Sequence, residues 1–107
     1  MIERKSVGDL ASSVTYGRER FFREVTRLAQ LVALGGGAAV VVEGDVSTLD
    51  RALADRRVEP WPVVTSTLAI VADGVPVVWA GNRANAERCA LWLLRRWAAR
   101  VAEGGRR

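Results

Sequence analysis

The segment GGGAAVVVEG, residues 35–44, decides how the rest of the chain is arranged. Three consecutive glycines end a preceding helix, and the β-branched valines that follow favour a short strand ending at Gly44. The strand is apolar on both faces, so we expect it to be buried with helices packed against it. This segment therefore predicts an α/β domain.

The residues before this segment predict an amphipathic helix over 17–34. Apolar side chains recur there at helical spacing, and oppositely charged pairs at i,i+4 occupy the other side. The apolar positions are Phe21, Val25, Leu28 and Val32, and the pairs are Glu19 with Arg23 and Arg20 with Glu24.

The residues after it alternate between helical and strand patterns. They predict a helix over 48–57 capped by Ser47, a loop over 59–62, a helix over 63–72, a strand over 75–81 and a last helix from 82 or 85 to about 102. The apolar stripe of the last helix is Ala86, Ala90, Leu94, Trp97 and Val101. We expect residues 1–103 to form one three-layer α/β domain with helices on both faces of the sheet, and residues 104–107 to form a disordered tail.

Composition narrows the possible functions. The 107 residues suffice for one domain, and they include no histidine and a single cysteine, Cys89. A zinc cluster, an internal disulfide and histidine-based catalysis are therefore excluded, so catalysis must rest on carboxylates and lysine. Sixteen basic residues against twelve acidic ones give a net charge of +4, which favours a polyanionic partner such as DNA.

The longest apolar stretch, LVALGGGAAVVV at residues 31–42, does not predict a membrane segment. It is interrupted by glycines and too short to span a bilayer, and the first residues of the chain are charged. We therefore expect no membrane association and a cytoplasmic location.

The first residues carry the most informative pattern, and they include the only lysine of the chain, Lys5. Met1 to Lys5 predicts the end of a strand, in which Glu3 and Lys5 share one face and Arg4 points to the other. A carboxylate can hold Mg²⁺, and an ammonium beside it can orient an attacking water and stabilise charge on a phosphate. Asp9 lies near enough in sequence to contact Lys5 or a metal-bound water.

The pattern Glu3-Arg4-Lys5-x-x-x-Asp9 resembles the signature of the nuclease domain of XPF-type (xeroderma pigmentosum group F) structure-specific endonucleases. Other segments are also similar to that family: DLASSVTYGRERF at 9–21, Arg27-Leu28, VVVEG at 40–44 and PVVWAGNRANAE at 76–87. The resemblance implies a restriction-endonuclease-like fold and metal-dependent cleavage of branched or junction DNA, as in DNA repair. It also implies Mg²⁺ or Mn²⁺ as the cofactor and a homodimer or heterodimer formed through the nuclease domain.

The resemblance assigns roles to the residues of the motif. Glu3 and the main-chain carbonyl of Arg4 would bind the metal ion, and Lys5 would be the catalytic lysine. Asp9 completes the signature.

Three further positions match the family, and each also has an interpretation that involves no function. The resemblance implies that Arg18 and Arg27 contact DNA phosphates and that Glu43 ends a matching strand, with no defined role. Alternatively, Arg27 pairs with Glu24, Arg18 only solvates the start of a helix, and Glu43 caps a neighbouring helix.

The chain departs from the family at its beginning. Family members carry an upstream strand pair whose Gly-Asp supplies a second metal-binding carboxylate, so the domain is expected to be N-terminally truncated and to hold Mg²⁺ weakly through Glu3. Cleavage by this chain is then expected to be feeble. The alternatives are a non-catalytic relative that binds DNA or a partner subunit, and a small α/β domain whose first charges are merely solvated.

The tryptophans need a separate interpretation, because aromatic side chains can fill cores or stack on bases. Trp97 lies on the apolar stripe and Trp79 ends a strand, so both are expected in the core. Trp92 lies off the stripe beside Arg95 and Arg96. It suits a dimer interface or a nucleic-acid surface, and the dimer interface is the favoured interpretation.

Overall fold

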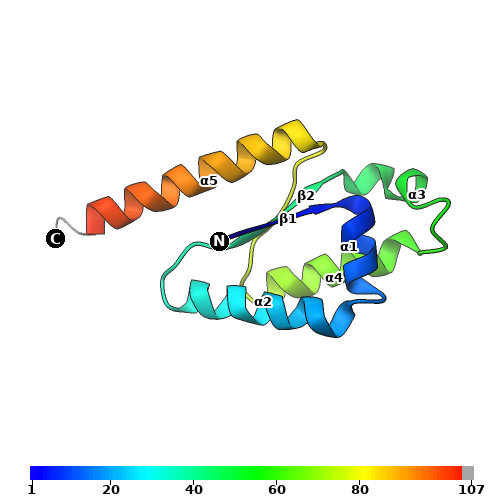
Figure 1. Ribbon diagram of the computed structural model, residues 1–107, viewed down its shortest axis with the longest axis horizontal. Helices are drawn as coiled ribbons and strands as arrows, with labels where there is room; N and C mark the ends of the chain where they lie inside the picture. The colour runs from blue at the N-terminus through cyan, green and yellow to red at the C-terminus, as the bar shows by residue number, and fades with distance from the viewer. Residues whose placement is uncertain (105–107) are drawn as a thin grey trace.

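Three short strands form the centre of the fold in the computed structural model, which describes residues 1–104 (Figure 1). They are β1 (Ile2–Ser6), β2 (Ala39–Glu43) and β3 (Val77–Trp79), and they run parallel in the order β1-β2-β3. Glu3 lies opposite Val40 and Lys5 opposite Val42. The strand predicted at Met1 to Lys5 is therefore confirmed, and it lies beside β2 at the edge of the described sheet.

Within residues 1–104, five α-helices connect and cover the strands: α1 (Val7–Val14), α2 (Arg18–Ala33), α3 (Leu49–Ala52), α4 (Pro60–Ala72) and α5 (Arg83–Gly104). A short 3-10 helix, Val46–Thr48, precedes α3. The side chain of Ser6 caps α1 by accepting a hydrogen bond from the Asp9 amide, and Asn82 caps α5 by accepting one from the Asn85 amide. After α2, Gly35 takes a φ of 87°, a left-handed conformation that glycine adopts without steric cost.

Three of the predicted boundaries are wrong. The strand predicted over 75–81 is limited to Val77–Trp79. The helix predicted over 48–57 ends at Ala52, because residues 53–57 form turns in which Arg57 has a positive φ of 53°. The segment 59–62, predicted as a loop from its prolines, contains the start of α4. Pro60 and Pro62 lie in the first helical turn, where a backbone N–H has no intrahelical acceptor, so the prolines cost no hydrogen bond.

Different helices cover the two faces of the sheet. Val40 and Val42 are fully buried in a cluster with side chains of α1, α2 and α4, among them Leu10, Val25 and Ile70. Figure 1 shows these three helices on one side of the strands and α5 on the other. The expected α/β class is confirmed, and the sheet has β2 at its centre with both faces buried.

α5 covers its face of the sheet mainly through its first turns, where Ala86 and Ala90 are buried. Further along, the ring of Trp97 lies against Gly37, but Leu94 is 48% exposed and Val101 76% exposed. The predicted apolar stripe is therefore confirmed as core at its start and wrong at its end. The reason is length: a helix of 22 residues is about 33 Å long, and its second half extends past the strands (Figure 1).

No helix in the described part of the chain is long and apolar enough to cross a membrane. Of the tail predicted over 104–107, Gly104 is the last residue of α5, and residues 105–107 lie outside the described residues.

Candidate active site

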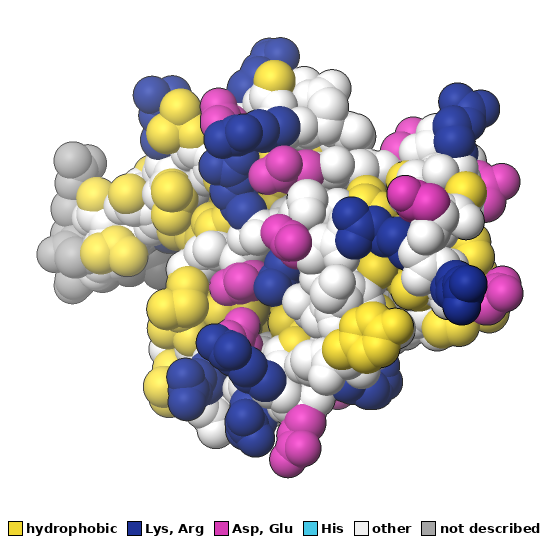
Figure 2. All heavy atoms as spheres, turned by 45° about the vertical axis from the view of Figure 1, so that its right-hand side comes forward, with side chains coloured by type: hydrophobic (Ala, Val, Ile, Leu, Met, Phe, Trp, Pro, Cys, Tyr) yellow, Lys and Arg dark blue, Asp and Glu magenta, His cyan; other side chains and the backbone are white. Residues whose placement is uncertain are grey.

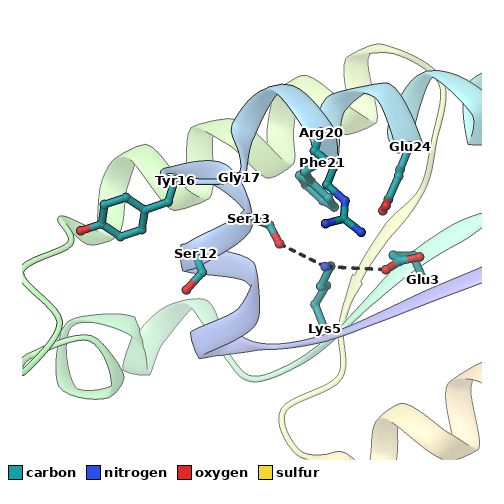
Figure 3. A pocket seen from close by; sticks show the side chains of 9 residues that line it. All are labelled: Glu3, Lys5, Ser12, Ser13, Tyr16, Gly17, Arg20, Phe21 and Glu24. Atoms are coloured by element: carbon teal, nitrogen blue, oxygen red, sulfur yellow. Dashed lines mark hydrogen bonds and ion pairs between the residues drawn. The ribbon is translucent and has the colours of Figure 1, made fainter.

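An open cavity of about 520 Å³ lies between β1, α1 and the start of α2, and it contains the side chains of Glu3 and Lys5 (Figure 3). Its lining consists of Glu3, Lys5, Ser12, Ser13, Tyr16, Gly17, Arg20, Phe21 and Glu24. The two strand residues reach it together because their side chains share one face of β1. The sheet thus supplies the floor of the cavity, and α1 and α2 supply its walls.

Lys5 is held by contacts on several sides. Its Nζ donates a hydrogen bond of 3.0 Å to the Ser13 hydroxyl, lies 3.7 Å from Oε1 of Glu3, and stands 5.1 Å from the centre of the Phe21 ring. The side chain is 17% exposed. An ammonium has three N–H donors, so Lys5 keeps the capacity to contact an anionic oxygen in the cavity while it remains bonded to Ser13.

Arg4 lies on the opposite face of β1, as the strand pattern predicts. Its Nη2 lies 3.3 Å from Oε1 of Glu43 and 3.7 Å from Oε1 of Glu87 on α5. Glu43 therefore belongs to an ion-pair cluster on the face of the sheet away from the cavity. The role implied for the main-chain carbonyl of Arg4 stays a prediction.

Asp9 is exposed in the first turn of α1 and is not among the residues that line the cavity. The hydrogen bond of Lys5 goes instead to Ser13, one turn further along the same helix. Ser13 thus takes the place that the sequence suggests for Asp9 as the partner of Lys5.

The two arginines implied to bind DNA lie in different surroundings. Nη1 of Arg18 donates to the Val14 carbonyl at 3.2 Å and to the Ser66 hydroxyl at 3.1 Å, and its guanidinium stands 4.7 Å from the centre of the Phe22 ring. These contacts join the start of α2 to α4. Arg18 therefore has a structural use, and this use differs from the solvated helix start that the sequence offered as the alternative.

Arg27 lines a smaller cavity of about 240 Å³ on α2, together with Arg20, Arg23 and Glu24. Arg20 and Glu24 line both cavities, so the basic side of α2 continues into the cavity that holds Lys5. Figure 3 shows Arg20 and Glu24 reaching toward Glu3 and Lys5 from the helix above the strand. Arg20, rather than Arg18, is the arginine beside Lys5.

Sequence reasoning missed Ser13, Arg20 and Glu24 as members of the site. The i,i+4 spacing of Arg20 and Glu24 was visible, but it indicates only that they share a side of the helix. The side of α2 that faces β1 depends on how the helix packs on the sheet, and the sequence pattern does not fix that packing.

Glu3 and Glu24 are the two carboxylates of the cavity. Within residues 1–104, no group of three or more His, Cys, Asp or Glu side chains is arranged to hold a metal ion. Mg²⁺ prefers oxygen ligands and is commonly held by one or two carboxylates together with water and substrate phosphates. Two carboxylates are therefore a donor set that fits Mg²⁺ only where water and a phosphate group supply further oxygens.

The basic side chains are distributed over the surface. Figure 2 shows Lys and Arg side chains on several parts of one face, with Asp and Glu side chains between them. The distribution of charge on this face therefore does not identify a binding surface for a polyanion. Such a surface has to be identified from the local arrangement of side chains.

The chain matches no protein-family model, no curated protein and no solved structure. Its function is therefore inferred from the residues of the cavity and from the motif that β1 carries.

Proposed function

We propose that this chain is a metal-dependent DNA endonuclease domain of the XPF type that acts on branched or junction DNA. The observation that carries the proposal is the convergence of Glu3 and Lys5 in one cavity, with the Lys5 ammonium fixed by Ser13 and lying 3.7 Å from the Glu3 carboxylate. A carboxylate that can hold a metal ion and an oriented ammonium can together support phosphodiester hydrolysis without a histidine.

Ser13 and the charged side chains of the cavity each have a role in this proposal. Lys5 orients the attacking water and donates to a non-bridging phosphate oxygen, and Ser13 holds the ammonium in that position. Arg20 contacts a phosphate at the entrance from α2, and Arg27 contacts the strand further along the helix. Asp9 stays outside the cavity in this scheme.

Mg²⁺ or Mn²⁺ would be held by Glu3 and Glu24, with the Arg4 carbonyl as a further ligand. When bound, the ion supplies charge neutralisation at the phosphate and lowers the pKa of a coordinated water. Two carboxylates make a modest site, so cleavage by this chain is proposed to be slow. The architecture proposed with this function is the three-layer restriction-endonuclease-like sheet.

A dimer is part of the proposal, and α4 supplies the surface that suits it. The helix PWPVVTSTLAIVA, residues 60–72, carries no charged side chain, yet Trp61 is 67% exposed, Leu68 54% and Val71 49%. Exposed apolar side chains gathered on one helix are typical of a surface that a partner covers. The side chain of Trp92, favoured from the sequence for the dimer interface, stands among arginines and suits that purpose less well.

The test is cleavage of a labelled fork DNA by the purified chain in Mg²⁺, in Mn²⁺ and in EDTA. We expect slow cutting that EDTA abolishes and that Glu3→Ala or Lys5→Ala reduces below detection while circular dichroism and DNA binding are retained. DNA binding without metal-dependent cutting would favour the non-catalytic relative. Cutting by Lys5→Ala at the wild-type rate would refute the assignment of the site.

A further inference from the structure

A second hollow lies on the other side of the sheet, between the end of β3 and the first half of α5. Its volume is about 640 Å³, and it is lined by Val78, Trp79, Ala80, Asn85, Arg88, Cys89, Trp92 and Leu93. A volume of this size lies within the range of small-molecule sites. Its lining is mostly apolar with a few polar groups, and it shares no residue with the cavity of Glu3 and Lys5.

Trp92 is the notable side chain of this hollow because it is 64% exposed. On a helix, the neighbours of a residue are found three and four positions away. Those of Trp92 include Arg88, Arg95 and Arg96, so three arginines share the side of α5 that carries the exposed indole. Within residues 1–104, none of the three arginines forms an ion pair or a side-chain hydrogen bond.

The arginines decide what can cover this surface. An isologous contact with a second copy would bring the same guanidinium groups of two chains together, and burying unpaired charges is costly. The uncharged surface of α4 has no such penalty. A polyanion, in contrast, would neutralise the arginines, and a polyanion that also carries planar apolar groups would use the indole.

We propose that Trp92, Arg88, Arg95 and Arg96 form a binding site for single-stranded nucleic acid, separate from the candidate active site. An unpaired base stacks on the Trp92 indole at the mouth of the hollow, where the Asn85 amide can contact its edge, and the arginines contact the flanking phosphates. Aromatic stacking combined with basic side chains is the common mode of single-strand recognition, and it requires no base sequence. Trp79 also contributes to the lining of the hollow, but its side chain is in register with Val42 and packs against the buried cluster on the other face of the sheet, so Trp92 is the stacking residue.

The test measures binding of a fluorescent oligothymidylate of about 15 nucleotides, with a blunt duplex of the same length as the reference, in EDTA so that no cleavage occurs. Trp92→Ala should weaken single-strand binding about tenfold or more and leave duplex binding within a factor of about two. Trp92→Phe should retain most of the affinity. Val101→Ala is the matched control, because Val101 is an exposed apolar side chain of the same helix, α5, that does not line the hollow.

The arginines and the cysteine give two independent readouts. Replacing Arg88, Arg95 and Arg96 with Gln should reduce the slope of log affinity against log salt by about two for the single strand. Cys89, the only thiol of the chain, lines the hollow, so bound oligothymidylate should slow its reaction with a maleimide and the duplex should not. The same binding measurement with oligouridylate identifies whether DNA or RNA is the better ligand. Tight binding of either oligonucleotide supports the proposed site.

Three results would overturn the proposal. The first is that Trp92→Ala binds oligothymidylate as tightly as the wild-type chain does. The second is that Trp92→Ala loses single-strand and duplex binding equally. The third is that the wild-type chain is a dimer and Trp92→Ala is a monomer, which would assign the surface to a second copy. Because the measurements are made without metal, an inactive Glu3 and Lys5 site would not affect them.

Discussion

Lys5 and Ser13 are joined by a hydrogen bond of 3.0 Å that links the candidate catalytic strand to the helix that follows it. The bond fixes the ammonium at the inner end of the cavity, between the Glu3 carboxylate and the Phe21 ring. A long lysine side chain has many rotamers, and restricting them during the reaction would cost conformational entropy. The hydrogen bond to Ser13 restricts the Lys5 side chain beforehand, so that cost does not add to the barrier.

Ser13→Ala should therefore slow cleavage by about tenfold to a hundredfold without changing the affinity for DNA. The lysine is retained in this variant, but its ammonium is no longer held in place. Ser13→Thr keeps the hydroxyl and should restore most of the rate. Single-turnover cleavage under saturating enzyme measures the effect, and a wild-type rate in Ser13→Ala would show that the hydrogen bond does not position Lys5.

Glu24→Gln should abolish metal-dependent cleavage as completely as Glu3→Gln does, because the two carboxylates are proposed to hold the same ion. Glu19→Gln is the matched control, since Glu19 is exposed on the same helix and does not line the cavity. Titration of cleavage rate with Mg²⁺ measures the change. Loss of cleavage in Asp9→Asn but not in Glu24→Gln would instead support the role that the motif assigns to Asp9.

Arg18 and Arg20 should behave differently when each is replaced with Gln. Arg18→Gln removes the contacts to Val14, Ser66 and the Phe22 ring, so it should lower the free energy of unfolding by about 1 kcal/mol. Arg20→Gln and Arg27→Gln should leave stability unchanged and each reduce the salt slope of duplex binding by about one. Urea melts and binding titrations over a salt series separate the two effects, and the reverse outcome would contradict the assignment.

Leu68→Glu should convert a dimer of this chain to a monomer, because it places a charge in the centre of the uncharged surface of α4. Sedimentation velocity over a range of protein concentrations measures the change. A wild-type chain that stays monomeric at the highest concentration would contradict self-association through α4.

Gly37→Ala should lower the free energy of unfolding by about 1–3 kcal/mol, because the added methyl group would collide with the ring of Trp97. The penalty should become smaller in a Trp97→Ala background, where the ring is absent. This double-mutant cycle measures how firmly the middle of α5 is attached to the loop before β2. Equal penalties in the two backgrounds would show that the contact is not the cause.

The sequence predicted the positions of the three strands, although not the full bounds of the third, because the signals involved are local. The valines of β2 and the alternation of Glu3, Arg4 and Lys5 both depend on side-chain direction within one strand, and both predictions are confirmed. The start of α4 was missed because prolines have the same appearance in a loop and in a first helical turn.

The candidate site was predictable only in the part that lies on one strand. The cavity also needs Ser13, Arg20 and Glu24, and these side chains meet Lys5 through the packing of α1 and α2 on the sheet. The exposed end of α5 was mispredicted for a related reason. Its apolar spacing continues past Ala90, but whether such a stripe is buried depends on the width of the sheet beneath it.

The strand order determines which part of the candidate active site unfolds first. β1 is an edge strand of the described sheet and pairs only with β2, yet it carries both Glu3 and Lys5. Edge strands open locally at a lower free energy than the central strand of the same sheet, and such opening needs no global unfolding. On warming, β1 should therefore separate from β2, and Glu3 and Lys5 should leave the cavity, before the core around Val40 and Val42 melts. The amide hydrogens of β1 should accordingly exchange with solvent faster than those of β2.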